Sequence, residues 1–253
     1  MIQLKNAQEL AKMRRACQIS AEALKLGGRS IEAGMTTADL DKIIYDYIKR
    51  HGARPNFKGL YGFPGTACIS INDEVIHGIP SHSRQIRPGD IVSIDTGAAI
   101  NGFNGDNACT FPCGKVDIEA QRLMDVTKES LHRGIAAAVA GNRVGDIGHA
   151  VQSYVEENGF SVVRSFVGHG VGKELHEDPE VPNYGHAGHG VRLVNGMTIA
   201  IEPMVNQKHH SVKTLSDGWT VVTADGGLAA HFEHSIAILL GGPEILTIGW
   251  EEP

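Results

Sequence analysis

Two aspartates stand out in a stretch of sequence that otherwise has the pattern of a buried hairpin. Residues 91–111 read IVSIDTGAAINGFNGDNACTF, with apolar and β-branched residues on both sides of an Asn-Gly turn signal. A turn centred on Ile100 and Asn101 places Asp95 opposite Asp106, whereas a turn centred one residue further along places them on a diagonal. Either register leaves both carboxylates on one face of the hairpin. Because buried like charges repel and lose hydration, the pattern favours a metal cation, and an edge hairpin with incidental acids is the alternative.

Three stretches in the second half of the chain carry further side chains that bind metals. His169 lies between glycines in FVGHGVGKELHEDP, where the alternative is a structural histidine in a turn. Glu202 follows four mostly apolar residues and precedes Pro203 in MTIAIEPMV, so it is expected at the buried end of a strand, where an unpaired carboxylate is costly. Glu233 lies in the strand-like run AAHFEHSIAIL, and its alternative is a salt bridge.

Carboxylates and one imidazole form a hard, oxygen-rich ligand set. This composition favours Mn, Fe or Co, and admits Zn, over metals bound by thiolates, and the excess of carboxylates indicates two bridged cations. Two divalent ions activate water and polarise a carbonyl, which is the chemistry of hydrolysis. The segment GHGVGKE is not a phosphate loop, because its glycines are one residue too close for GxxxxGK and Glu174 stands at the Ser/Thr position.

Helices are expected on either side of these strands. Asn6 and Glu9 have the spacing of a capping box, and the apolar residues that follow recur at helical spacing. Thr37 is expected to cap a second helix, ADLDKIIYDYIKRHG, which ends before Gly52.

A displacement of 107 positions along the chain reproduces this helix pair. It places Gly27 on Gly134, and four further matches are Gly34 on Gly141, Asp39 on Asp146, Tyr47 on Tyr154 and Gly52 on Gly159. Accidental similarity is the alternative. We interpret the match as a duplicated α+β domain with helices covering one side of a curved mixed sheet. The prediction is one domain over residues 1–253, with pseudo-repeat halves of about 5–115 and 116–248.

Composition narrows the classes of function. The chain has 253 residues, is 42% hydrophobic and carries a net charge of −6, so binding to nucleic acids or to membrane surfaces has no electrostatic support. Its four cysteines form no CxxC pair, which favours a reducing compartment over a disulfide scaffold. The first twenty residues interrupt their apolar positions with charge and read as neither a signal peptide nor a membrane span.

Six segments, taken in chain order, carry a resemblance to a known family. They are CISINDEVIHGIP, IVSIDTGAAINGFNGD, GHGVGKELHEDP, IAIEPMV, DGWTVVT and FEHSIAI. The sequence resembles type I methionine aminopeptidase, of peptidase family M24, from about Leu4 to Thr247. The resemblance implies the pita-bread fold and the hydrolytic removal of N-terminal methionine from nascent proteins and peptides, with a small uncharged second residue preferred. It also implies two divalent metal ions (Co, Mn, Fe or Zn) on a set of five ligands: Asp95, Asp106, His169, Glu202 and Glu233.

The resemblance also assigns catalytic roles that the residues alone do not reveal. It implies that Glu202 shuttles a proton and that His77 in IHGIP and His176 in LHEDP contact the scissile peptide and the developing oxyanion. Without the resemblance, both histidines read as ordinary loop histidines.

The family's pocket for the methionine side chain maps to Phe63, Cys68, Leu175 and Trp219, with Leu60 and Phe57 near its rim. Aromatic and soft apolar residues suit an unbranched thioether, and ordinary core packing is the alternative for each of them. Some members of the family have Tyr at the position of Leu60, Cys at that of Phe57 and Phe at that of Leu175.

Two rival interpretations share the expected fold, and only the second belongs to a different functional class. Prolidase, aminopeptidase P and creatinase share the expected fold, but they resemble chains with an extra N-terminal domain, whereas this chain starts directly at the catalytic helices. A non-catalytic binding module of the same fold is expected to have lost metal ligands, and all five are present here.

The expected partners are nascent polypeptide N-termini at the ribosome, with no direct binding of nucleic acid or membrane. A monomer in the cytoplasm is expected.

Overall fold

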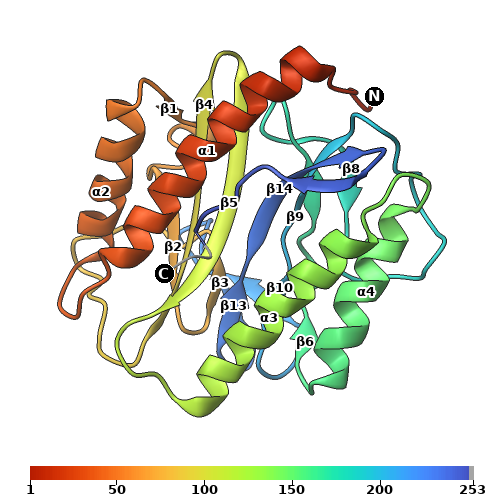
Figure 1. The fold of residues 1–253 in the computed structure, drawn as a ribbon. Helices are drawn as coiled ribbons and strands as arrows, with labels where there is room; N and C mark the ends of the chain where they lie inside the picture. The colour runs from red at the N-terminus through yellow and green to blue at the C-terminus, as the bar shows by residue number, and fades with distance from the viewer. Residues whose placement is uncertain (251–253) are drawn as a thin grey trace.

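The computed structural model describes residues 1–250, so residues 251–253 of the predicted domain lie outside the described part of the chain. Within it, four α-helices lie in front of the sheets in Figure 1. The helices are α1 (Ala7–Arg29), α2 (Thr37–Arg50), α3 (Ile118–Ala137) and α4 (Val144–Glu157), and a short 3-10 helix spans Leu60–Gly62. The strands are β1 (Arg54–Pro55), β2 (Ala67–Ile71), β3 (Glu74–Ile76), β4 (Ile91–Ile100), β5 (Phe103–Pro112), β6 (Ser161–Val162), β7 (Gly168–Gly170), β8 (Glu177–Val181), β9 (Thr198–Ile201), β10 (Met204–Asn206), β11 (Val212–Thr214), β12 (Val221–Thr223), β13 (Ala229–His231), β14 (Glu233–Leu239) and β15 (Gly242–Ile245).

The central sheet joins strands from both halves of the chain. Its order is β1-β4-β5-β14-β9-β7-β8, with β2 also paired to β4 and β15 also paired to β14. Two three-stranded sheets, β13-β10-β6 and β11-β12-β3, complete the described part. Every described strand pair is antiparallel, so the prediction of a mixed sheet is wrong on this point. The helices cover the sheet without serving as crossovers between parallel neighbours.

The hairpin of β4 and β5 adopts the second of the two predicted registers. Asn101 and Gly102 have φ angles of 54° and 77°, the left-handed pair of a type I′ turn, whose twist suits a two-residue hairpin. Asp95 therefore lies opposite Ala108, and the two aspartates form the diagonal pair. The prediction that both share one face is confirmed.

Capping boxes start the first two helices. The Asn6 side chain accepts hydrogen bonds from the backbone N–H groups of Gln8 and Glu9, as predicted. The second helix is capped by Thr36 rather than by the predicted Thr37. The capping box requires an acid three residues after the cap, and Asp39 stands at that distance from Thr36.

The two helix pairs correspond closely in space as well as in sequence. The bounds of α4 are those of α2 displaced by 107 positions. In the linker of the first half, Gly34 donates a backbone hydrogen bond to Ile86 O at 2.8 Å, and in the second half Gly141 donates to Leu193 O at 2.9 Å. Both glycines have positive φ angles, of 92° and 106°. These paired features support the proposed duplication, with halves of about 5–115 and 116–248.

Helices α1 and α3 pack closely against one face of the central sheet, which leaves the opposite face for functional side chains. A Cβ atom at Gly27 of α1 would approach Ile94, and a Cβ atom at Gly134 of α3 would approach Ile201. Ile94 and Ile201 therefore point toward the helices. Because side chains alternate along a strand, the next residue after each isoleucine, which is a carboxylate in both halves, points to the opposite face.

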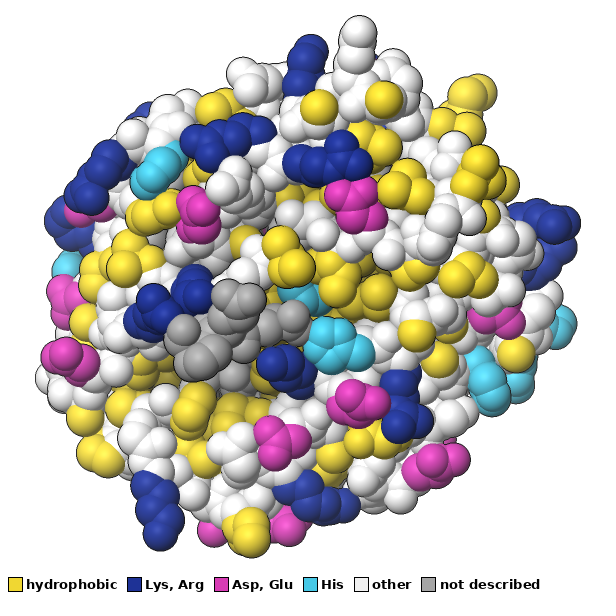
Figure 2. Space-filling view, in the orientation of Figure 1, with side chains coloured by type: hydrophobic (Ala, Val, Ile, Leu, Met, Phe, Trp, Pro, Cys, Tyr) yellow, Lys and Arg dark blue, Asp and Glu magenta, His cyan; other side chains and the backbone are white. Residues whose placement is uncertain are grey.

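The helical face carries charges of both signs. Figure 2 shows Lys and Arg side chains interspersed with Asp and Glu over this face, without a continuous stripe of one sign. No helix within residues 1–250 is both long and apolar enough to cross a bilayer.

The buried isoleucine between α1 and the sheet gives a test of the packing. Ile94→Ala should lower the free energy of unfolding by about 3 kcal/mol, because Ile94 is 0% exposed and its removal leaves a cavity. Urea denaturation measures the change. Ile118→Ala, at a side chain that is 80% exposed, is the control and should change stability by no more than about 0.5 kcal/mol. Equal effects of the two substitutions would contradict the packing described here.

Candidate functional site

Three carboxylates lie together on the sheet face opposite the helices. Asp95 on β4 and Glu233 on β14 both pair with Ala108 of β5, so the two acids belong to one row across three strands. Asp106 lies two residues before Ala108 on β5 and therefore points to the same face. Asp106 and Glu233 are only 3% and 2% exposed. The sheet therefore concentrates negative charge away from water.

The remaining two predicted ligands approach from β7 and from the end of β9. Nε2 of His169 lies 3.8 Å from Asp106 Oδ2 and 3.6 Å from Glu202 Oε1. Nδ1 of His169 lies 2.8 Å from the carbonyl oxygen of Gly170, so Nδ1 carries the proton and Nε2 presents its lone pair to the carboxylates. One donor atom each from Asp106, His169 and Glu233 lies within 4.8 Å of the others. Glu202 lies beside this group and Asp95 lines the same cavity, so the structure brings all five predicted ligands to one cavity.

The electrostatics of this cluster favour a bound cation. Burial raises the pKa of Asp106 to about 7, and burial with the neighbouring carboxylates raises the pKa values of Asp95, Glu202 and Glu233 well above their usual range. Burial, with a smaller contribution from His176, lowers the pKa of His169 to about 4, so this ring is neutral. Among the described residues, Asp95 Oδ1, Asp106 Oδ1 and Glu233 Oε1 are buried without a hydrogen-bond donor. Divalent cations fit such a set of orphaned oxygens and one imidazole nitrogen.

Two more histidines lie around the cluster, one from each half. The ring of His176, in the loop between β7 and β8, lies 4.5 Å from the ring of His169 at an angle of 85°. His77 follows β3 with a φ of 60°, a left-handed conformation that is uncommon for a non-glycine residue. Burial lowers the pKa of His77 to about 4 and lowers that of His176 as well. Both rings are therefore neutral near pH 7, and each offers one N–H donor.

A single cavity of about 550 Å³ contains the whole arrangement. Beside the carboxylates its wall is apolar, with the ring of Phe63 packed 5.1 Å from that of Trp219 at 68°. The predicted ligands, both histidines and all residues predicted for the methionine pocket line it, namely Phe57, Leu60, Phe63, Cys68, His77, Asp95, Asp106, His169, Leu175, His176, Glu202, Trp219 and Glu233. The structure therefore joins a polar, metal-binding floor to an apolar side pocket.

Sequence reasoning missed two residues of this region. Tyr61 lies at the cavity, is 78% exposed and has a φ of 50°, and its ring lies parallel to that of His176 at 6.2 Å. The glycine-rich run that contains Tyr61 was the available signal. His231 is buried, with Nε2 at 3.7 Å from Glu202 Oε2. Its spacing of two residues from Glu233 could have placed it on the same strand face.

Comparison with known proteins identifies the family. The model of metallopeptidase family M24 matches residues 11–239. The methionine aminopeptidase of Clostridium perfringens (strain 13 / Type A) is 55% identical over 248 residues, which cover 98% of this chain and 99% of the relative. Methionine aminopeptidase 1 of Bacillus subtilis (strain 168) is 51% identical over 247 residues, with coverage of 98% and 99%.

Solved structures agree with these relatives. The crystal structure of methionine aminopeptidase from Thermotoga maritima superposes with a TM-score of 0.96 at 45% identity, covering 98% of this chain and 99% of that one. The prolidase of Pyrococcus horikoshii OT3 has a TM-score of 0.78 at 22% identity and is covered over 63% of its length, so it shares the fold alone. The predicted pita-bread fold is confirmed. The chain belongs to metallopeptidase family M24, within its methionine aminopeptidases.

Proposed function

We propose that this protein hydrolyses the first peptide bond of polypeptides that begin with methionine, and that it prefers a small uncharged second residue. The observation that carries the proposal is the buried cluster of carboxylates and one imidazole beside an apolar pocket in a single cavity. The relatives named methionine aminopeptidase, at 51–55% identity over nearly the full chain, support the same activity.

The five clustered side chains would hold two divalent ions, which we propose to be Co, Mn, Fe or Zn. They are Asp95, Asp106, His169, Glu202 and Glu233. Their orphaned oxygens and the free lone pair of His169 Nε2 match the donors that such ions take. When bound, divalent ions activate water and polarise a carbonyl group, which are the two requirements of peptide hydrolysis.

Glu202 is proposed to move the proton. Its carboxylate lies between the imidazoles of His169 and His231, at 3.6 and 3.7 Å. Burial and the nearby Asp106 raise its pKa well above the usual range, which makes its carboxylate a better proton acceptor. Glu202 would take a proton from the attacking water and return it to the leaving amine.

His77 and His176 are proposed to orient the substrate. As neutral rings on the cavity wall, each donates one hydrogen bond without bringing a charge to the site. His77 contacts the scissile peptide. His176 donates a hydrogen bond to the carbonyl oxygen as negative charge develops on that oxygen.

The apolar wall is proposed to select the first residue. Phe63, Cys68, Leu175 and Trp219 form a contiguous cluster that suits a flexible thioether. A charged first residue would lose hydration there, and a β-branched one would meet steric conflict.

The setting of the reaction is also a proposal. The substrates would be nascent polypeptide N-termini, met at the ribosome, and the protein would act as a cytoplasmic monomer. The whole chain would form one catalytic domain, because both halves contribute ligands to one cavity.

Removal of divalent ions should abolish turnover, and Mn, Co or Fe should restore it. Since burial raises the pKa of Asp106 to about 7, this carboxyl carries a proton at about pH 6 that a metal ion must displace. Calorimetry in buffers of different ionisation enthalpy should show proton release on metal binding, and less of it at about pH 8. Full activity of an exhaustively stripped sample would refute the mechanism.

His176→Ala should lower kcat by about 100- to 1,000-fold, because it removes a hydrogen bond to the developing oxyanion. Metal content, measured by elemental analysis, should stay unchanged, since His176 is proposed to lie outside the ligand set. His186→Ala is the matched control at an exposed histidine outside the cavity. A loss of metal in proportion to activity would make His176 a ligand.

The pocket predicts an order among peptides. Met-Ala-Ser should be cleaved efficiently, Met-Lys-Ser little, and Leu-Ala-Ser or N-blocked Met-Ala-Ser almost not at all, as measured by kcat/KM. A large second residue would displace the scissile carbonyl from the ligand cluster. Comparable values for Met-Ala-Ser and Leu-Ala-Ser would instead indicate a broad aminopeptidase on this fold.

A further inference from the structure

The loop that carries His176 has no regular structure, although the proposed chemistry requires a fixed ring. This loop, here the His176 loop, comprises residues 172–177, and its last residue, Glu177, is also the first residue of β8. It also presents Leu175 to the cavity. Catalysis requires the ring to stay within well under 1 Å of its productive position. Contacts from outside the loop must therefore hold the loop in place.

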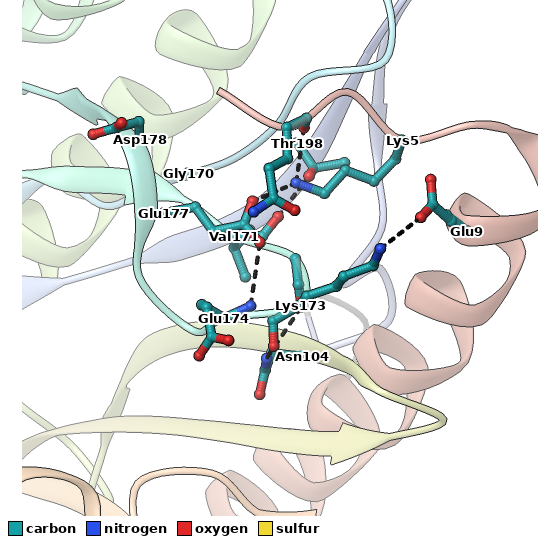
Figure 3. Close-up of polar contacts among 12 residues, drawn as sticks. Lys5, Glu9, Asn104, Gly170, Val171, Lys173, Glu174, Glu177, Asp178 and Thr198 are labelled. Carbon is teal, nitrogen blue, oxygen red and sulfur yellow. Dashed lines mark hydrogen bonds and ion pairs between the residues drawn. The ribbon is translucent and has the colours of Figure 1, made fainter. Parts of the chain in front are cut away.

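A buried lysine near the start of the chain makes the main contact. Lys5 Nζ lies 2.5 Å from Oε2 of Glu177, the residue that follows His176, and also donates to Gln3 O at 3.0 Å (Figure 3). The two charged side chains are 3% and 5% exposed. The backbone of Lys5 is itself anchored by a 2.7 Å hydrogen bond to Gly196 O. Such a pair is shielded from water, so it constrains geometry more strongly than a surface ion pair.

The loop is shaped around this ion pair. A Cβ atom at Gly172 would lie 2.6 Å from Lys5 Nζ and 2.7 Å from Glu177 Oε1, so only glycine leaves room for the pair. Glu177 Oε1 accepts a hydrogen bond from the backbone N–H of Glu174 at 3.2 Å. The Glu177 carboxylate therefore ties the middle of the His176 loop to Lys5.

Asn104 and Glu9 hold the first residues of the loop. The Asn104 side chain on β5 donates to the carbonyl oxygens of Gly172 and Lys173, at 3.1 and 2.9 Å. Lys173 forms a 3.0 Å ion pair with Glu9 of α1, but its side chain is 54% exposed. Figure 3 shows both contacts on the side of the loop that leads toward β5 and α1. At the other end of the loop, Glu177 pairs with Gly170 of β7 and its side chain is held by Lys5.

We propose that Lys5 is a positioning residue for His176, acting through its buried ion pair with Glu177. The ammonium group holds the carboxylate, and the carboxylate holds the backbone from which the neighbouring imidazole extends. The inference rests on the proposed function, in which His176 contacts the substrate carbonyl.

The test is a double-mutant cycle on the metal-loaded full chain with Met-Ala-Ser as substrate. Lys5→Met should lower kcat by about tenfold to 100-fold with metal content unchanged, because the ring is displaced and no ligand is lost. In a His176→Ala background the same substitution should change kcat by no more than about twofold, since the group through which Lys5 acts is gone. Hydrogen exchange of residues 172–177 should become faster in Lys5→Met.

Two further variants separate positioning from stability. Lys173→Met, which removes the exposed ion pair of the same loop, is the matched control and should change kcat by no more than about twofold. Lys5→Met combined with Glu177→Gln leaves no unpaired buried charge, so it should recover the melting temperature lost in Lys5→Met while kcat stays low. If Lys5→Met alone does not fold, kcat is measured in this double variant instead.

Three results would overturn the inference. They are an equal loss of kcat from Lys5→Met in both backgrounds, full recovery of kcat in the double variant, and unchanged hydrogen exchange of the His176 loop. A wild-type protein that fails to cleave Met-Ala-Ser would refute the proposed function instead, and the exchange measurement would still report whether Lys5 holds the loop.

Discussion

The burial of four carboxylates around one point is the constraint on which the rest of the structure depends. Burial removes much of the water that would stabilise their charge, and no lysine or arginine lines the cavity among the described residues. Each carboxyl therefore has a raised pKa until cations replace the missing positive charge. A flexible frame would relax this strain by moving the acids apart. The paired strands of the central sheet hold them in place, which makes the sheet a preorganised binding site.

The site is built where the two halves of the chain meet. The first half supplies Asp95 and Asp106, and the second supplies His169, Glu202 and Glu233. The similarity between the halves extends to the site, since a carboxylate follows the helix-facing isoleucine of β4 and that of β9. Each half thus places one acid on the face opposite its own helix pair. Because the halves join in one sheet, the side chains from the first half lie beside those from the second.

Strands and loops supply different kinds of residue to this cavity. The proposed ligands come from strands or their ends, where backbone pairing fixes them, whereas His77 and His176 come from irregular segments. His77 is held in a left-handed conformation, and the His176 loop is held by a buried ion pair to Lys5. Two prolidases share the fold at 22–23% identity, so the fold alone does not decide the substrate. In the proposed function, the apolar cluster beside the carboxylates selects the substrate.

The sequence by itself determined the features that depend on local periodicity. The hairpin with both aspartates on one face, the Asn6 cap and the helix pairs 107 positions apart all follow from spacing along the chain. The exact hairpin register, the antiparallel sheet and the ion pair of Lys5 with Glu177, 172 positions away, were decided only by the tertiary structure. Periodicity reports which face a residue occupies. It does not report which distant residue lies opposite, because that depends on how the strands pair and how the helices pack.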